Sequence, residues 1–181
     1  MTVFVSGGAK NGKSSLAQRL AVRLAAGGPL YYVATMLPSD AEDRARIARH
    51  VADRAGLGFT TLECPRDILS CLDGADAAGT FLLDSVTALF MNELFPDPRR
   101  PDTDPEAARR CAVGLTAFVR RVRHAVVVSD YICSDAADYD DVTETFRRGL
   151  ASIDRALAAA CDTVVEVAAG IPTVHKGGLP E

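Results

Sequence analysis

The sequence lacks the features that mark secreted, membrane-spanning and nucleic-acid-binding proteins. Its five cysteines are odd in number and scattered without a C-x-x-C pair, which argues against a disulfide framework or a zinc site. No apolar run approaches the length of a membrane span, and the chain opens on a strand pattern rather than a basic and apolar leader. The net charge of −4 argues against a nucleic-acid backbone as partner. We therefore expect a cytoplasmic protein with free thiols, no nucleic-acid partner and no membrane span.

Length and periodicity predict a single α/β domain over residues 1–181. Short β-rich runs alternate with longer helical patterns, which predicts a mainly parallel sheet with helices on both faces. The polar, Pro-rich segment 95–105 reads as a surface connection within that domain. The predicted strands are Thr2–Ser6, Leu30–Ala34, Phe59–Leu62, Thr80–Asp84, Ala125–Asp130, Asp162–Val167 and, at an edge, Ile171–Val174. The predicted helices are Lys13–Ala26, Ala41–Ala55, Val86–Leu94, Pro105–Arg123 and Val142–Ala160.

A phosphate-binding loop is the most informative motif of the chain. The stretch Gly7-Gly8-Ala9-Lys10-Asn11-Gly12-Lys13-Ser14 completes the G-x-x-x-x-G-K-[ST] spacing between an apolar run and a helical pattern. Its glycines let backbone N–H groups turn around an anion, and the start of the following helix adds to that field. Lys13 is expected against the β- and γ-phosphates and Ser14 on Mg²⁺. A chance Gly-rich turn is the alternative, and motif, position and flanks together argue for a P-loop NTPase-type fold.

Two acids end apolar strands that we expect to open onto the same crevice. Asp84 follows Phe81-Leu82-Leu83, and Asp130 follows a run of valines and a serine. At the carboxyl end of a parallel strand such a carboxylate can hold Mg²⁺ or its water shell. The alternative is that each acid caps the next helix, and the balance favours a functional role more for Asp84 than for Asp130. The acids between 135 and 141 match no calcium-binding loop and are expected to cap a helix.

A stripe of basic residues marks the predicted helix Ala41–Ala55. Arg46, His50 and Arg54 recur at intervals of four, which places them along one side of a helix. Two flanking guanidiniums favour a neutral, nucleophilic imidazole, and they can also grip phosphate oxygens in pairs. The alternative is a solvated face with an incidental histidine, and spacing alone favours that alternative.

The chain resembles the adenosylcobinamide kinase / adenosylcobinamide-phosphate guanylyltransferase family of cobalamin biosynthesis over nearly its whole length. The resemblance begins in the loop Gly7–Ser14 and continues through Tyr32-Val33-Ala34-Thr35. It includes Arg46-Ile47-Ala48-Arg49-His50-Val51-Ala52-Asp53-Arg54, which is similar to the Arg-Ile-x-x-His-x-x-x-Arg of the family. It also includes Leu82-Leu83-Asp84-Ser85-Val86-Thr87 and Asn92-Glu93-Leu94-Phe95, where the family carries an acid and then Asn-Leu-Leu/Phe.

The resemblance implies a bifunctional enzyme that uses ATP or GTP with Mg²⁺. In the family a nucleoside triphosphate phosphorylates the aminopropanol hydroxyl of adenosylcobinamide, and a histidine then carries GMP from GTP to the product. His50 and Lys13 are accordingly the expected catalytic residues, Ser14 and Asp84 the expected metal ligands, and Arg46 and Arg54 expected nucleotide contacts. Family members assemble as trimers, so a homo-oligomer is expected.

The C-terminal third departs from the family pattern. The family glycines are absent from Asp130–Asp138, and the helix segment Glu144–Arg155 keeps Phe146 and Arg147 but changes most other family positions. Two alternatives therefore stay open beside the bifunctional enzyme. One is a small-molecule or nucleotide kinase without guanylyl transfer, and the other is a nucleotide-binding protein that has lost corrinoid turnover.

Overall fold

The computed structural model describes residues 1–97, 99–100, 102–132 and 137–180, apart from the side chain of Arg46. Its strands form one sheet in the order β3-β2-β4-β5-β1-β6-β7, in which β7 alone among the described strands runs antiparallel to its neighbour. The strands are β1 (Thr2–Gly7), β2 (Leu30–Ala34), β3 (Thr60–Glu63), β4 (Thr80–Asp84), β5 (His124–Asp130), β6 (Thr163–Ala168) and β7 (Ile171–Lys176). The helices are α1 (Lys13–Ala25), α2 (Ala41–Asp53), η1 (Ile68–Leu72, a 3₁₀ helix), α3 (Val86–Leu94), α4 (Ala107–Arg121) and α5 (Asp141–Ala160).

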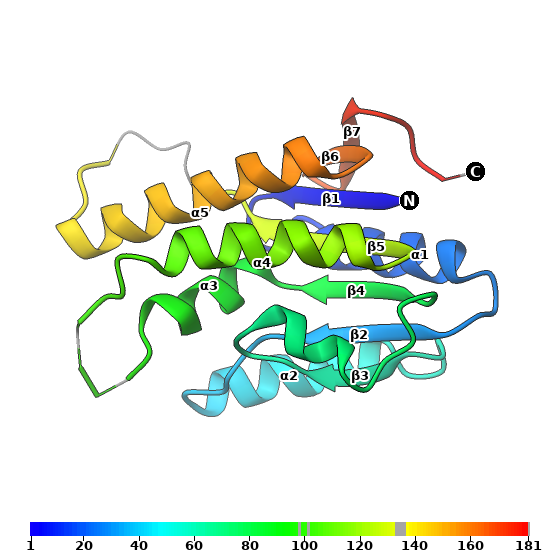
Figure 1. Ribbon diagram of the computed structural model, residues 1–181, viewed down its shortest axis with the longest axis horizontal. Coiled ribbons are helices and arrows are strands. Elements are labelled where there is room, and N and C mark those ends of the chain that lie inside the picture. Colours follow the sequence, from blue (N-terminus) through cyan, green and yellow to red (C-terminus); the bar gives the residue numbers. More distant parts are fainter. Residues whose placement is uncertain (98, 101, 133–136, 181) are drawn as a thin grey trace.

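Helices cover both faces of the sheet. α3, α4 and α5 lie on the near face in Figure 1, and α1 and α2 lie behind it. Alternate strand residues point to opposite faces, so Phe81 and Val127 pack beneath α3–α5 while Leu82 and Val126 pack against α1. The predicted parallel α/β fold of the P-loop type is confirmed.

Side-chain caps start three of the helices. Asp40, Ser85 and Asp140 accept a hydrogen bond from the first turn of α2, α3 and α5, respectively. The prediction that the acids before α5 cap it is therefore confirmed for Asp140. Ser85, rather than Asp84, caps α3, which leaves the Asp84 carboxyl available to the crevice.

Three local differences from the predicted elements have physical causes. The helix predicted to reach Ala55 ends at Asp53, and glycines with positive φ follow at Gly56 and Gly58. β7 extends to Lys176 and includes Pro172, which an edge strand tolerates because one side makes no ladder bonds. The 3₁₀ helix η1 was not predicted, since it is a single short turn.

The cysteine prediction is confirmed where it can be checked. Cys64, Cys71, Cys111 and Cys161 are buried and free, while Cys133 lies outside the described residues. Within the described part of the chain, no helix is long and apolar enough to cross a membrane.

Candidate active site

The phosphate-binding loop connects β1 to α1 at the carboxyl edge of the sheet. Gly7 has a φ of +154°, and a Cβ there would collide with the carbonyl oxygen of Val167 on β6. Gly12 also has a positive φ, of +92°, and precedes the first turn of α1. The loop is further held by β6 and by the β6–β7 connection: Asn11 Nδ2 donates to the Val167 carbonyl, and the Asn11 carbonyl accepts from Gly170 N at 3.1 Å. Position 7 requires glycine, because the loop backbone lies so close to the Val167 carbonyl that no side chain fits there.

The ammonium group of Lys13 binds two oxygen acceptors within the protein. Its Nζ donates to the Gly8 carbonyl at 2.7 Å and pairs with Asp130 Oδ1 at 2.9 Å. The side chain of Lys13 is only 6% exposed. Gly7 and Asp130 are partners in the β1–β5 register, which explains why the acid reaches the loop lysine. Asp130 therefore belongs to the crevice and does not cap a helix, so the functional interpretation of this residue is favoured.

Asp84 ends β4 on the far side of β5 from the loop. Burial raises the pKa of its carboxyl, while His50 and the hydroxyls of Ser14 and Tyr32 oppose that rise. Tyr32 Oη donates to Asp84 Oδ2 at 3.3 Å. Unlike Asp130, Asp84 forms no ion pair with a lysine or arginine among the described residues.

These oxygen groups fit a magnesium ion. Mg²⁺ prefers oxygen ligands and uses one or two carboxylates together with water and phosphate oxygens. The buried Asp84 carboxyl lies beside the Ser14 hydroxyl and pairs with no lysine or arginine among the described residues, so it has that chemistry. The described residues contain no group of three or more His, Cys, Asp or Glu side chains that could bind a metal without a nucleotide.

His50 lies in the last turn of α2 and faces the same crevice. It is partly buried, and it lies close enough to Asp84 that a positive charge on its ring lowers the pKa of that carboxyl. Its Nδ1 is buried and has no hydrogen-bond partner among the described residues. An imidazole is one of the side chains that can form a covalent intermediate, and no described protein group competes for this nitrogen.

Arg54 lies just beyond α2, and its side chain contacts residues of β2 and β3. Its guanidinium stacks 3.9 Å from the centre of the Tyr32 ring and donates to Thr61 Oγ1 at 3.2 Å. The predicted three-residue stripe is therefore interrupted, because the helix ends before Arg54. The side chain of the other predicted arginine, Arg46, lies outside the described part of the chain.

Four polar residues at the crevice were given no role from the sequence. Tyr32 contacts Asp84, and Thr35, which is fully buried, bonds to the backbone of the residue after Asp84. Asn92 and Asp154 approach from α3 and α5. The strand-end rule that identified Asp84 would also have found Thr35. Asn92 lies in a segment that carries the family resemblance but received no role from it, and Asp154 has no local signal.

Known proteins resemble the chain at the levels of family and fold. The profile of the family described as "Cobinamide kinase / cobinamide phosphate guanyltransferase" matches residues 3–174. A relative from Pseudomonas aeruginosa, named bifunctional adenosylcobalamin biosynthesis protein CobP, is 30% identical over 98% of both chains. A relative from Salmonella typhimurium, bifunctional adenosylcobalamin biosynthesis protein CobU, is 31% identical over 94% of this chain and 97% of its own.

Solved structures agree on the fold alone. The flagellar accessory protein FlaH of Methanocaldococcus jannaschii superposes with a TM-score of 0.51 at 13% identity, covering 98% of this chain and 78% of its own. An ATPase domain superposes with a TM-score of 0.51 at 8% identity, over 91% of this chain and 68% of its own. The profile match includes the loop, α2 and β4 and extends into β7, and two relatives match over nearly their full length. The chain belongs to the cobinamide kinase / cobinamide phosphate guanyltransferase family.

Proposed function

We propose that this enzyme carries out both family reactions at the crevice between the Gly7–Ser14 loop, Asp84 and His50, within one domain. The observation that carries the proposal is the convergence of three segments distant in sequence. The loop lysine, the β4 carboxyl and the α2 imidazole all face the carboxyl edge of the sheet. A loop for triphosphate binding and a nucleophile beside it suit two successive phosphorus-transfer reactions.

In the first reaction the aminopropanol hydroxyl of adenosylcobinamide attacks the γ-phosphorus of ATP or GTP. The new oxygen–phosphorus bond replaces the bond to the β,γ-bridging oxygen, and a nucleoside diphosphate leaves. Lys13 leaves Asp130 and neutralises the charge that develops on the phosphate oxygens, and Asp130, which this movement frees, receives the hydroxyl proton. Mg²⁺, held by Ser14 and Asp84, supplies further positive charge to the phosphates when it is bound.

In the second reaction a ring nitrogen of His50 attacks the α-phosphorus of GTP. The bond to the α,β-bridging oxygen breaks and pyrophosphate leaves, so the histidine carries GMP. A phosphate oxygen of the phosphorylated corrinoid then attacks the same phosphorus, which releases the imidazole and gives the GDP-linked product. Arg46 and Arg54 are proposed contacts of the nucleotide phosphates, and Arg54 reaches them by leaving Tyr32 and Thr61.

Two assays on the purified protein test this proposal. Label from the γ-phosphate of ATP or GTP should pass to adenosylcobinamide, and labelled pyrophosphate should exchange into GTP. The His50→Asn variant should keep the first activity and lose the second. Phosphoryl transfer without exchange in the parent protein would favour the kinase alternative, and nucleotide binding without either activity would favour the nucleotide-binding alternative.

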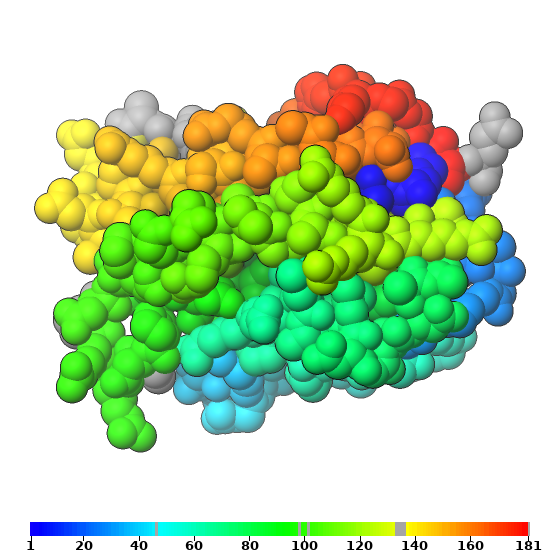
Figure 2. Space-filling view, in the orientation of Figure 1, coloured from blue at the N-terminus to red at the C-terminus, as the bar shows by residue number. Residues whose placement is uncertain are grey.

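We also propose an assembly and a cellular location for the protein. The resemblance predicts a homo-oligomer, specifically a trimer, and β7 offers an edge strand that is exposed along its whole length. In Figure 2 this segment stands on the outside of the molecule, next to the C-terminal residues. Ile171 is 68% exposed there, so an oligomer that covers it would bury apolar surface. Light scattering of the purified protein would give the subunit number. The free buried thiols support a cytoplasmic location.

A further inference from the structure

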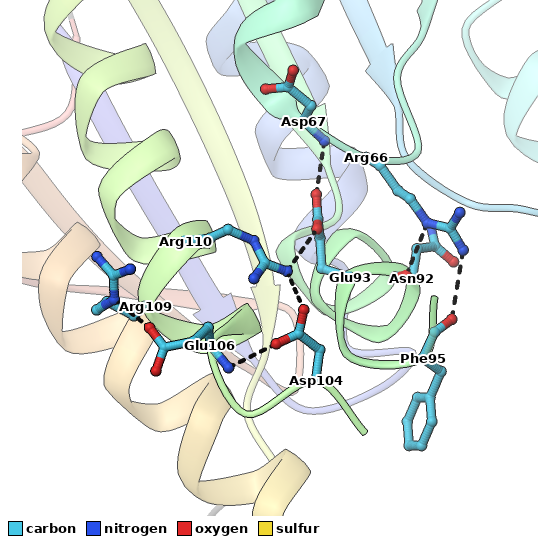
Figure 3. Close-up of polar contacts among 9 residues, drawn as sticks. All are labelled: Arg66, Asp67, Asn92, Glu93, Phe95, Asp104, Glu106, Arg109 and Arg110. Carbon is cyan, nitrogen blue, oxygen red and sulfur yellow. Dashed lines mark hydrogen bonds and ion pairs between the residues drawn. The ribbon is translucent and has the colours of Figure 1, made fainter. Parts of the chain in front are cut away.

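One amide on α3 joins the ends of two neighbouring strands. Asn92 Nδ2 donates to the Thr35 carbonyl at 2.8 Å and to the Pro65 carbonyl at 2.9 Å. Thr35 follows β2 and Pro65 follows β3, so a single NH₂ group ties two chain segments at the point where their ladder has ended. Figure 3 shows that the backbone carbonyl of Asn92 is held in turn by Arg66, whose Nε donates to it at 2.9 Å.

The side chain of Thr35 in turn binds the residue that follows β4. The β2–β4 ladder ends at the pair Ala34 and Asp84, after which the two chains separate. Thr35 Oγ1 replaces the missing ladder bonds, because it donates to the Ser85 carbonyl and accepts from Ser85 N, both at 2.8 Å. Thr35 is fully buried, so neither bond is exchanged with water. Ser85 is the residue directly after Asp84, and its position fixes the direction of the Asp84 backbone.

The chemistry of the position explains why an amide is present. Two carbonyl oxygens converge on one site, and an asparagine NH₂ offers one proton to each. An aspartate of the same shape would place a third acceptor there, and a leucine would leave both carbonyls without that donor.

We propose that Asn92 is a positioning residue that, through Thr35 and Ser85, fixes the Asp84 carboxylate opposite Ser14 in the metal–phosphate part of the site. This inference rests on the proposed role of Asp84 in holding Mg²⁺. It predicts a defect in metal-dependent nucleotide binding alone. The Gly7–Ser14 loop follows β1, and β5 and β4 separate β1 from β2, so the loop does not depend on the bonds of Asn92. Loss of the Asn92 amide should weaken the contribution of Mg²⁺ to nucleotide binding and leave metal-free binding to the loop unchanged.

The test measures the dissociation constant of a fluorescent ATP analogue with Mg²⁺ and with EDTA, and takes the ratio as the Mg²⁺ enhancement. Asn92→Leu and Thr35→Val remove the bonds at nearly constant volume, and each should lower the enhancement about tenfold, the size expected for one or two lost hydrogen bonds. Thr35→Ser keeps the hydroxyl and should stay within about twofold of the parent.

A matched control comes from the same helix and the same polar network. Glu93 accepts from Asp67 N at 2.8 Å and pairs with Arg110 at 3.5 Å (Figure 3), and neither of these two interactions involves Thr35. Glu93→Gln should lower the Tm without changing the Mg²⁺ enhancement.

Three outcomes are decisive. An unchanged enhancement in Asn92→Leu and Thr35→Val, with a lowered Tm, would make Asn92 a purely structural residue and overturn the proposal. Absence of Mg²⁺ enhancement in the parent protein would instead overturn the proposed role of Asp84, and this inference with it. If Asn92→Leu does not fold, the contrast between Thr35→Val and Thr35→Ser decides alone, and equal enhancements in that pair would overturn the proposal.

Discussion

Replacement of Asp154 by asparagine should stabilise the protein above neutral pH. Asp154 lies on α5, and its Oδ1 is buried with no hydrogen-bond partner among the described residues. Burial raises the pKa of its carboxyl to about 7, the nearby Ser129 hydroxyl opposes that rise, and the charge of Asp130 adds to it. An ionised carboxylate at this position is therefore poorly solvated.

The sign and size of the effect follow from proton linkage. Between about pH 4 and pH 7 the folded protein keeps the Asp154 proton while the unfolded chain has lost it, so stability falls as the pH rises through this range. A pKa of about 7, against about 4 in an unfolded chain, corresponds to about 4 kcal/mol at pH 8. Relaxation and water entry reduce this figure, so we expect Asp154→Asn to gain about 2–4 kcal/mol at pH 8 and to match the parent at pH 4.

Urea unfolding at intervals between pH 4 and pH 8 measures the difference directly. Asp162→Asn is a control of opposite sign, because Asp162 accepts from Thr2 N at 2.7 Å and from Thr2 Oγ1 at 3.1 Å. These bonds lower the pKa of Asp162, so its variant should lose stability at pH 8. A pH-independent difference between Asp154→Asn and the parent protein would refute the reasoning.

Three further predictions test the loop, its acidic neighbours and the end of α5. Lys13→Ala should lower kinase turnover by about 10²–10³ without changing the circular dichroism spectrum, and near-normal phosphorylation would contradict a catalytic loop. Nucleotide binding near pH 7 should be accompanied by uptake of a proton by Asp154, because Lys13 must leave Asp130 for the phosphates and the uncompensated charge of Asp130 then raises the pKa of Asp154. Calorimetry in buffers of different ionisation enthalpy would detect the uptake, and uptake that persists in Asp154→Asn would disprove this source. Lys176→Met should lower the Tm by about 3–6 °C, since Lys176 Nζ donates to three backbone carbonyls at the end of α5 at 2.6–3.1 Å, and an unchanged Tm would show that these bonds do not stabilise the fold.

The sequence predicts the parts of the site that depend on local order along the chain. The loop could be recognised because strand, glycines and helix follow one another directly, and Asp84 because it ends an apolar strand. The ion pair of Asp130 with Lys13 required the strand order, which places β5 beside β1. The periodicity also placed nearly every strand and helix within two residues of its observed bounds.

The missed residues depend on contacts between distant segments. Asn92 meets Thr35 across 57 positions of sequence, and a polar residue near the end of a short, mostly apolar helix gives no sign of that partner. Asp154 reads as a polar position of an amphipathic helix, and only the folded structure buries it beside Ser129 and Asp130 of β5. The end of α2 was misplaced by two residues, which was enough to move Arg54 from the predicted stripe onto Tyr32.

Labelling with GTP tagged at the α-phosphate tests the central claim that His50 carries GMP. The protein would be incubated with the label and Mg²⁺, denatured, and treated with acid or base. We predict label that survives base, is released by mild acid as expected for a phosphorus–nitrogen bond, and is absent from His50→Asn. Label that persists in His50→Asn would place the nucleophile elsewhere, and an unlabelled parent protein would contradict covalent guanylyl transfer.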